Sequence, residues 1–314
     1  MGIVSEVDLI TKVAILYYKK GLNQTTIAEK LGISRPKVSR LISKAHDQNI
    51  VKIEINSPTM DSSYLESELV EKYDLKDFIV VNMTDTEPEE EKKDKLGEHG
   101  VEFLNRISQG EEFLGISAGT TLHHFAKKAH AIKNSNFKII PLVGALNDTG
   151  LSYNCNEISN ILSANLGGTN YLLNAPALVR DNQTASVFKQ ESRIKKIYDL
   201  YEKLDIAILG IGQADESHPL ISGHLNKEEL DEFRDLALCG SIGPIFYDLS
   251  GSIVSLPFEE RIIGIDQENL FNTEFRIGLA VGKYKRKAIL GALRSKIINV
   301  LITDKSMADW LVKQ

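Results

Sequence analysis

Near the start of the chain, apolar residues recur at the three- and four-residue spacing of amphipathic helices in three successive stretches. The stretches are residues 7–20, 24–31 and about 35–48. Gly32 follows the second stretch, where a glycine can end a helix in the left-handed conformation at little cost. Ser34 offers a hydroxyl to cap the next helix, and Pro36 falls in its first turn, where proline is tolerated. The pattern predicts three packed helices, of which the last two are joined by a tight turn.

The pattern changes after the third predicted helix. Residues 51–55 alternate between apolar and polar, which predicts a short strand and one side of a wing. Residues 56–59, Asn-Ser-Pro-Thr, have the composition of a hinge. We therefore predict a small winged-type domain over residues 1–57 and a larger domain over residues 58–314.

Short apolar runs and amphipathic stretches alternate through the larger domain. The runs Ile206–Leu209 and Val300–Ile302 are uninterrupted, as in strands that are covered on both faces. Strands are predicted at 78–81, 112–116, 138–143, 170–174, 205–211, 244–248, 262–265, 276–281 and 299–303. Helices are predicted at 64–73, 87–107, 120–133, 156–166, 190–203, 227–238, 284–294 and 305–313. This order predicts the α/β fold class, with a doubly wound, Rossmann-like sheet in the larger domain.

The composition is that of a globular protein, with 42% hydrophobic and 25% charged residues. No apolar run approaches the roughly 18 residues of a membrane span, and a signal-peptide pattern is absent. Cys155 and Cys239 are far apart, and His123, His124 and His130 have no acidic or thiol group at ligand spacing, which argues against a disulfide or metal framework. We expect a cytoplasmic protein with no membrane partner and no cofactor.

Formal charge is unevenly distributed along the chain. Residues 1–56 contain nine Lys/Arg and five Asp/Glu, a net charge of +4, whereas the whole chain carries −6. The remaining residues therefore carry −10. Only the basic N-terminal part suits a phosphate backbone, which favours nucleic-acid binding by that part alone.

The second and third predicted helices have the pattern of a helix-turn-helix, whose second helix enters the major groove of DNA. If Ser34 caps that helix, Arg35 and Arg40 lie on its exposed face near the N-terminal end, where each could donate paired hydrogen bonds to a guanine. Gln24, Thr25 and Lys44 are placed for phosphates. The candidate DNA-binding residues are Gln24, Thr25, Ser34, Arg35, Pro36, Lys37, Ser39, Arg40 and Lys44. The alternative is a helical hairpin in an unrelated small domain.

A second candidate site lies where the strand predicted at 112–116 gives way to a helix. Thr120 and Thr121 place hydroxyls beside the free N–H groups of a helix N-terminus, and Gly119 allows close approach of a ligand. Such a turn suits a phosphate or the oxygens of a sugar. An ordinary strand-to-helix turn has the same spacing, so the pattern alone leaves both interpretations open.

The same stretch matches G-x-S-x-G, the nucleophile elbow of α/β-hydrolases, through Gly115, Ser117 and Gly119. That class needs an acid and then a histidine late in the chain. The last histidines are His218 and His224, and some ninety residues of predicted strands and helices follow them. This order argues against a hydrolase.

Two further motifs follow predicted strands. Gly210-x-Gly212 is weak evidence for a nucleotide, and is better interpreted as a backbone platform where a sheet opens to a ligand. Lys285 lies in the segment Gly282-Lys-Tyr-Lys-Arg-Lys and could neutralise a ligand phosphate. A solvated lysine at a helix start is the commoner role for such a residue.

These segments together resemble the SorC family of bacterial sugar-responsive transcriptional regulators, across essentially the whole chain. In the N-terminal part the similarity is carried by Ala14-Ile-Leu-Tyr-Tyr, Gln24-Thr-Thr-Ile-Ala-Glu-Lys-Leu-Gly-Ile-Ser-Arg and Val38-Ser-Arg-Leu. In the body it is carried by Gly115-Ile-Ser-Ala-Gly-Thr-Thr-Leu, Leu209-Gly-Ile-Gly, Phe246-Tyr-Asp-Leu-Ser-Gly, Ile289-Leu-Gly-Ala-Leu and Asn299-Val-Leu-Ile-Thr-Asp. The combination is specific to the family, whereas no single motif is.

The resemblance implies an effector domain of the type shared with ribose-5-phosphate isomerase and glucosamine-phosphate deaminase. It also implies a tetrameric repressor or activator that responds to a sugar or sugar-phosphate effector. A symmetric dimer or tetramer would place its recognition helices on the two half-sites of a palindromic operator DNA. The residues that match the family's phosphate-binding positions are Ser117, Gly119, Thr120, Thr121, Leu122 and Lys285. Those that match the rim of the same pocket are Gly144, Asn156 and Gly212, and Ser241 stands at a sugar-binding position.

The chain departs from the family pattern at four positions. Ala118 replaces a tryptophan, Ser241 replaces the acid of a Gly-Asp-Ile motif, and Val281 replaces the first glycine of a Gly-Gly-x-x-Lys motif. Val143 stands where the deoxyribonucleoside-regulator branch has a lysine, so a Schiff base with the effector is not expected. These departures bear on which effector is bound. The sorbose/sorbitol-type members are the most similar.

The hypothesis that follows is a transcriptional regulator of a carbohydrate uptake or catabolic operon, controlled by a sugar or sugar-phosphate effector. The alternative is a sugar-phosphate isomerase or deaminase with an appended DNA-binding head. Such an enzyme needs a positioned carboxylate base beside the phosphate turn, and Ser241 occupies the place of the acid. We therefore expect a regulator and no catalytic residues.

Overall fold

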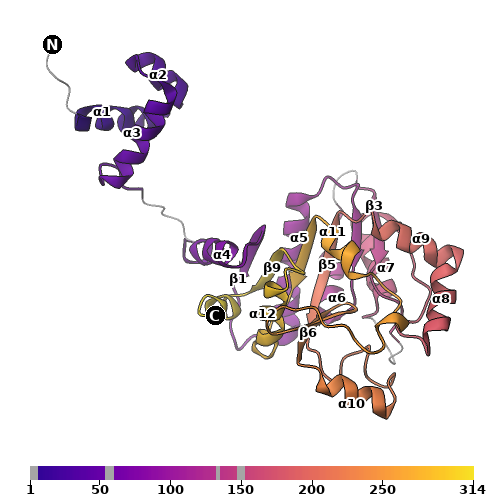
Figure 1. Cartoon of the computed structure of the whole chain (residues 1–314). Helices are drawn as coiled ribbons and strands as arrows, with labels where there is room; N and C mark the ends of the chain where they lie inside the picture. Colours follow the sequence, from indigo (N-terminus) through magenta and orange to yellow (C-terminus); the bar gives the residue numbers. More distant parts are fainter. Residues whose placement is uncertain (1–5, 54–59, 132–134, 147–152) are drawn as a thin grey trace. The chain divides into compact units, whose positions relative to one another are not determined.

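The computed structural model of the chain describes residues 6–53, 60–131, 135–146 and 153–314 (Figure 1). The chain divides into two compact units, Met1–Met60 and Asp61–Gln314. The hinge predicted at 56–59 and the domain boundary predicted at residue 57 lie outside the described residues.

The first unit is made of short helices around one small core. Its helices are α1 (Glu6–Ala14), a π-helical turn (Ile15–Lys19), α2 (Gln24–Leu31) and α3 (Arg35–Asp47). Ile10, Val13, Ile27, Val38 and Leu41 are buried together between them. Because these are the positions that the helical periodicity assigns to one face, the three predicted helices are confirmed.

The turn between α2 and α3 is closed by a glycine. Gly32 adopts φ 63°, a left-handed conformation, and the N–H of Ile33 donates to the carbonyl of Ala28 at 3.0 Å. Ser34 has the backbone conformation of an N-cap, but its side chain makes no capping hydrogen bond, so the predicted hydroxyl cap is wrong. Pro36 lies in the first turn of α3, as predicted.

The strand predicted at 51–55 is absent from the described part of that segment, Val51–Ile53. The N–H groups of Ile50 and Val51 both donate to the carbonyl of Ala45, at 2.9 and 3.0 Å, and both side chains pack against the core of the first unit. These residues therefore finish the C-terminal end of α3 instead of beginning a wing. The rest of the predicted strand lies outside the described residues.

The second unit is built on a parallel sheet (Figure 1). Its described parallel strands, in spatial order, are β1 (Asp77–Val81), β9 (Val300–Asp304), β8 (Phe275–Leu279), β5 (Ile206–Gly212), β2 (Phe113–Ile116), β3 (Phe137–Pro141) and β4 (Gly168–Asn170). The predicted α/β fold class with a parallel sheet is confirmed. Non-consecutive neighbours such as β5 and β2 follow from helical crossovers.

Helices cover both faces of this sheet. α5 (Glu89–Ile107), α6 (Thr120–Lys128) and α7 (Cys155–Leu166) share one buried cluster with Ile206 and Ile208 of β5. Ala207 and Leu209 belong to the other cluster. The helices of that cluster are α4 (Met60–Tyr73), α8 (Asn182–Gln190), α9 (Ser192–Tyr201), α11 (Gln267–Asn272), α12 (Arg286–Arg294) and α13 (Lys305–Leu311). Burial on both faces explains why the strand sequences are uninterrupted apolar runs.

An antiparallel hairpin extends the sheet at the carboxyl end of β5. β6 (Leu238–Ile242) pairs with β5 and with β7 (Ile245–Asp248), and α10 (Lys227–Asp235) precedes it. β6 is a strand that we did not predict, because its first residue falls in the helix expected at 227–238. The strand predicted at 262–265 is wrong: this buried segment forms only isolated bridges, from Gly264 to Val143 and from Ile262 to Leu178.

Other elements were predicted at shifted positions or were not predicted. The strand expected at 170–174 lies at 168–170, and the helix expected at 190–203 begins two residues later, at Ser192. α8 and α11 were not predicted. In the segment expected as a strand at 170–174, Leu173 is buried but Leu172 is 44% exposed, whereas Ile194 and Ile197 of α9 are both buried.

α5 and α6 pack closely because α5 carries two glycines at the contact. A Cβ on Gly97 would lie 3.0 Å from the backbone Cα and N of Phe125, and one on Gly100 would lie 2.9 Å from the ring of the same residue. Phe125 is fully buried at the centre of α6. The glycines therefore set the position of α6 against the sheet.

Both cysteines lie in packed surroundings. Cys155 is buried at the start of α7 and Cys239 is half-buried in β6, and both are free thiols. Burial raises the pKa of Cys155 to about 12 and that of Cys239 to about 11.

Within the described ranges, every helix is too short or too polar to cross a lipid bilayer.

Candidate functional site

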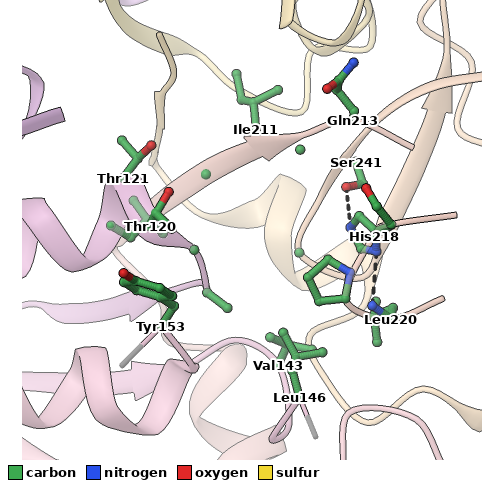
Figure 2. A pocket seen from close by; sticks show the side chains of 18 of the residues that line it. Thr120, Thr121, Val143, Leu146, Tyr153, Ile211, Gln213, His218, Leu220 and Ser241 are labelled. Atoms are coloured by element: carbon green, nitrogen blue, oxygen red, sulfur yellow. Dashed lines mark hydrogen bonds between the residues drawn. The ribbon is translucent and has the colours of Figure 1, made fainter. Parts of the chain in front are cut away.

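A cavity of about 390 Å³ opens at the carboxyl ends of β2 and β5 in the second unit (Figure 2). Ligands of open parallel sheets bind at this edge, because the strand ends and the following helix N-termini converge there. The cavity is lined by Ala118, Gly119, Thr120, Thr121, Leu122, Val143, Leu146, Tyr153, Asn154, Gly210, Ile211, Gly212, Gln213, Asp215, Ser217, His218, Pro219, Leu220, Ser241, Gly243 and Lys285.

One wall of the cavity is the N-terminus of α6. Gly119 precedes the helix with φ 133°, and its own N–H donates to the carbonyl of Tyr153 at 3.1 Å. The N–H groups of Thr120, Thr121 and Leu122 belong to the first helical turn and have no partner among the described residues. Three free donors, two threonine side chains and the positive end of the helix favour an anionic group here.

Lys285 lines the same cavity from the turn before α12. Burial of its ammonium group, followed by the nearby positive charge of Lys93, lowers the pKa of Lys285 to about 8. The side chain is thus still predominantly charged at neutral pH. A partly desolvated ammonium group beside free helical N–H groups strengthens the preference for an anion.

The opposite side of the cavity carries a paired histidine and serine. Figure 2 shows His218 and Ser241 across the cavity from Thr120 and Thr121. A hydrogen bond of 2.8 Å joins His218 Nε2 to Ser241 Oγ, and the N–H of Leu220 donates to His218 Nδ1 at 3.2 Å. Burial lowers the pKa of His218 to about 4, so the imidazole is neutral near pH 7.

The floor between these two walls is largely apolar. Val143, Leu146 and Leu220 line it, together with Tyr153, whose ring packs edge-to-face against His123 with centroids 5.2 Å apart. A small polar molecule with one anionic end fits this combination of walls and floor.

Among the described residues, no group of three or more His, Cys, Asp or Glu side chains could hold a metal ion.

The structure brings most of the predicted effector residues together at one cavity. Those that line it are Gly119, Thr120, Thr121, Leu122, Gly212, Ser241 and Lys285. The commoner role for a lysine at the start of a helix is a fully solvated one, but Lys285 is partly buried. Val143 also lines the cavity and carries no amine that could form a Schiff base.

Ser117, Gly144 and Asn156 were predicted beside the effector but do not line the cavity. Ser117 is buried, and its Oγ accepts from the N–H of Gly210 at 3.3 Å. The side chain of Asn156 bonds the N–H and the carbonyl of Leu173, both at 3.1 Å. A Cβ on Gly144 would lie 2.6 Å from the carbonyl oxygen of Ala175. These three residues shape the backbone around the cavity instead.

The buried hydroxyl of Ser117 also removes the basis for a nucleophile elbow. That motif requires a hydroxyl exposed at the top of the sheet and a histidine to activate it. Ser117 is only 1% exposed, and the cavity histidine, His218, is bonded to Ser241.

Sequence reasoning missed His218, Gln213 and Tyr153 as cavity residues. Gln213 follows the Gly210-x-Gly212 strand end directly, which is a signal that could have identified it. His218 and Tyr153 enter from loops. No periodic pattern indicates where a loop side chain will lie.

In the first unit, the predicted DNA-contacting side chains share the exposed face of α3. Ser34, Arg35, Pro36, Lys37, Ser39 and Arg40 are exposed, while Val38 and Leu41 are buried on the opposite face. On α2, Thr25 is exposed and Gln24 is half-buried. Lys44 forms an ion pair with Glu6 of α1, which lowers the pKa of Glu6 through that hydrogen bond and charge. Part of the positive charge of α3 is therefore already compensated within the unit.

Comparison with known proteins extends over nearly the whole chain. Residues 57–313 match the family model described as "Putative sugar-binding domain". The sorbitol operon regulator of Klebsiella pneumoniae is 30% identical over 316 residues, which cover 98% of each protein. The chain belongs to the SorC family. The family model thus matches the second unit, and the alignment with this relative includes the first unit as well.

Two further comparisons support this SorC-family assignment. The deoxyribonucleoside regulator of Bacillus subtilis is 29% identical over 306 residues, covering 97% of each chain. The crystal structure of the full-length sorbitol operon regulator from Klebsiella pneumoniae matches with a TM-score of 0.75 and 29% identity, over 98% of this chain and 99% of that one.

Proposed function

We propose that this SorC-family protein is a sequence-specific DNA-binding transcriptional regulator of a carbohydrate uptake or catabolic operon. The observation that carries the proposal is the 98% coverage of a named operon regulator, which spans both the basic helical unit and the unit with the cavity. Residues 1–57 would bind DNA and residues 58–314 would bind the effector and form the oligomer. The protein would act in the cytoplasm, where its operator DNA lies.

The DNA-binding part of the proposal is supported by the exposed face of α3. In a helix-turn-helix the N-terminal part of the second helix approaches the base edges. Arg35 and Arg40 are exposed on this part of α3, and both are free to donate paired hydrogen bonds to a guanine. Thr25 and Lys37 are exposed and suit contacts with phosphates, as does Gln24, which is half-buried.

The effector part is supported by the cavity in the second unit. A sugar phosphate would place its phosphate at the N–H groups of Thr120–Leu122 and at Lys285, and its sugar hydroxyls toward Ser241. Such an effector domain would be of the type shared with ribose-5-phosphate isomerase and glucosamine-phosphate deaminase. The names of two relatives, a sorbitol operon regulator and a deoxyribonucleoside regulator, are consistent with a carbohydrate-related effector.

Control by the effector requires different affinities for the DNA-competent and DNA-incompetent assemblies, since only that difference can shift the equilibrium between them. A symmetric dimer or tetramer would present two copies of α3 to the half-sites of a palindromic operator.

Catalysis by the second unit is not favoured. An isomerase or deaminase needs a carboxylate base next to the reacting carbon. Asp215 is the carboxylate among the described lining residues, and it is exposed, with Oδ1 accepting hydrogen bonds from the N–H and hydroxyl of Ser217 at 2.9 and 2.5 Å. The relatives are named regulators, which agrees with a non-catalytic role. Turnover of a sugar phosphate by the purified protein would contradict the proposal.

The DNA-binding role is tested with Arg40→Ala and Arg40→Lys, measured on a duplex that the wild-type protein selects from a random-sequence pool. Arg40→Ala should weaken binding to the selected duplex by about 1–3 kcal/mol while leaving binding to a scrambled duplex nearly unchanged. Arg40→Lys should lose most of the same selectivity, because lysine keeps the charge but not the paired donors.

Lys12→Ala is the matched control, since Lys12 is an exposed cation on α1 of the same unit. It should leave selectivity intact. Equal selectivity in Arg40→Ala and Lys12→Ala would exclude α3 as the helix that reads the sequence.

A further inference from the structure

The His218–Ser241 pair is the most specific polar feature of the cavity that the family resemblance does not explain. Ser241 stands where the family pattern has an acid, and it is only 2% exposed. His218 reaches it from a loop that follows β5, with its ring packed edge-to-face on Phe246 at a centroid distance of 4.9 Å. A Cβ on Gly212 would lie 3.0 Å from Ser241 Oγ, so the backbone closes tightly around the hydroxyl.

The hydrogen bonds of His218 fix which of its ring nitrogens carries the proton. A backbone N–H can only donate, so the contact from Leu220 requires His218 Nδ1 to be an unprotonated acceptor. The neutral ring then carries its proton on Nε2, which donates to Ser241 Oγ at 2.8 Å. Packing and hydrogen bonding therefore hold the histidine in one tautomer.

This arrangement determines what Ser241 can offer a ligand. Its oxygen already accepts one hydrogen bond from His218, and the hydrogen of its hydroxyl remains for a partner in the cavity. A carboxylate at the same position would present acceptors and a negative charge, but no donor. The pair thus replaces a negatively charged group that only accepts hydrogen bonds with a neutral hydroxyl that can also donate one.

Among the described lining residues, this end of the cavity holds no buried charge. Asp215 is the titratable lining group nearest in sequence to His218, and it is exposed and bonded to Ser217. Lys285 lies on a different element, in the turn before α12. A cationic amine placed at Ser241 would therefore be desolvated without a buried counter-charge, which is unfavourable.

We propose that His218 and Ser241 set the specificity of the effector site, selecting a ligand that presents a neutral acceptor oxygen to Ser241, such as a carbonyl, ring or hydroxyl oxygen. A ligand with a protonated amine at that end is excluded. This inference rests on the proposed function, because it assumes that the anionic end of the effector lies at the N-terminus of α6.

The probes that test it are glucose 6-phosphate, fructose 6-phosphate and glucosamine 6-phosphate, which share the phosphate and differ at the end remote from it. Binding to the full chain is measured by calorimetry. The wild-type protein should bind at least one of the neutral hexose phosphates about tenfold or more tightly than glucosamine 6-phosphate. Ser241→Asp should reverse this ratio.

Two further variants keep the test informative if Ser241→Asp does not fold. Ser241→Cys is near-isosteric but a weak donor, and His218→Gln removes the imidazole that fixes the hydroxyl. Each should reduce the ratio of affinities between the neutral and the amino probe several-fold, a readout that a merely structural role would not move. Ser222→Ala, an exposed serine outside the cavity, is the control and should leave the ratio unchanged.

The outcomes separate this inference from the proposed function. Binding of the hexose phosphates without a preference against the amine, or a preference that survives Ser241→Cys and His218→Gln, would overturn the inference alone. Failure of all three probes and of free hexitols to bind the wild-type protein would overturn the proposed sugar effector and the inference with it.

Discussion

At the scale of single residues, burial moves the pKa values of Lys285 and His218 in the same direction, with different consequences. Lys285, with a pKa of about 8, keeps most of its positive charge at neutral pH, whereas His218, with a pKa of about 4, has none. The lysine side chain at one end of the cavity is therefore cationic, and the histidine side chain at the other end is neutral. This polarity would orient a ligand that has a single anionic group.

The binding of a phosphorylated ligand should depend on pH through Lys285. An anion favours the charged form of the lysine, so binding weakens as pH rises through about 8 and the free protein loses this proton. We expect the affinity for glucose 6-phosphate, or for whichever hexose phosphate binds best, to fall about tenfold between about pH 7 and pH 9. Calorimetry at each pH, in buffers of different ionisation enthalpy, measures both the affinity and the proton uptake.

Lys285→Met should bind more weakly at pH 7 and should lose most of this pH dependence. Lys287→Met, an exposed lysine on α12 outside the cavity, is the matched control and should retain it. The same decrease of affinity between pH 7 and pH 9 in wild type and Lys285→Met would assign the dependence to another group.

The sequence was sufficient to locate the turn that lines the cavity, but not the orientation of each side chain in it. Thr120, Thr121 and Ser117 have similar chemistry and lie within five residues, yet only the two threonines line the cavity. Ser117 points to the backbone of Gly210 on the neighbouring strand, a contact that depends on the strand order. Strand order is a property of the whole sheet and cannot be obtained from local spacing.

At the scale of elements, the position of α6 decides the geometry of the cavity wall that its N-terminus forms. α6 lies against α5, where Gly97 allows the two helix backbones to approach. The same contact fixes the direction in which the first-turn N–H groups of α6 point. We therefore expect the cavity to depend on a helix contact whose residues, Gly97 and Phe125, do not line it.

Gly97→Ala tests this dependence. The added methyl group would meet the backbone of Phe125 at 3.0 Å, which backbone atoms can relieve only by moving α6. We expect a loss of about 1–3 kcal/mol in the free energy of unfolding and a several-fold loss of hexose-phosphate affinity. Urea unfolding and calorimetry measure the two effects.

Glu102→Ala, an exposed position on the same helix, should change neither quantity appreciably. A Gly97→Ala protein that loses stability but binds ligand as the wild type does would show that the position of α6 does not control the cavity.

Among the elements, strands that are covered on both faces were predicted well, and β6 was missed for a physical reason. Leu238-Cys-Gly-Ser-Ile contains two small residues, and a Cβ on Gly240 would lie 2.7 Å from the hydroxyl of Tyr247. Close packing thus requires a residue that weakens the strand pattern. The segment 262–265 gave the opposite error. Its isoleucines form an apolar run because they are buried, but the segment does not pair with a neighbouring strand in a ladder.

At the scale of the whole molecule, charge separates the two units more clearly than hydrophobicity does. The first 56 residues carry a net charge of +4 in a chain whose total is −6. An acidic second unit would repel a phosphate backbone, so we expect nonspecific contact with DNA to be confined to the first unit. The uneven charge was visible in the sequence, because it depends only on composition.

The salt dependence of DNA binding should therefore arise from a few residues of the first unit. We expect Lys37→Ala to lower the slope of log affinity against log salt by about 1, with little change in the preference for the selected duplex over a scrambled one. Fluorescence anisotropy over a range of potassium chloride concentrations measures the slope. An unchanged slope would show that Lys37 makes no phosphate contact.

The burial of both native thiols has a practical consequence for spectroscopy. Because thiolate is the reactive form, Cys155 and Cys239 should react slowly with maleimide dyes near neutral pH. The two native cysteines of the wild-type chain should thus take up little dye when an introduced cysteine is labelled. A cysteine introduced at exposed Lys12 and another at exposed Glu228 would carry a donor and an acceptor dye, one on each unit. Energy transfer between the dyes would then follow the two units during a single ligand titration, without removal of a native cysteine.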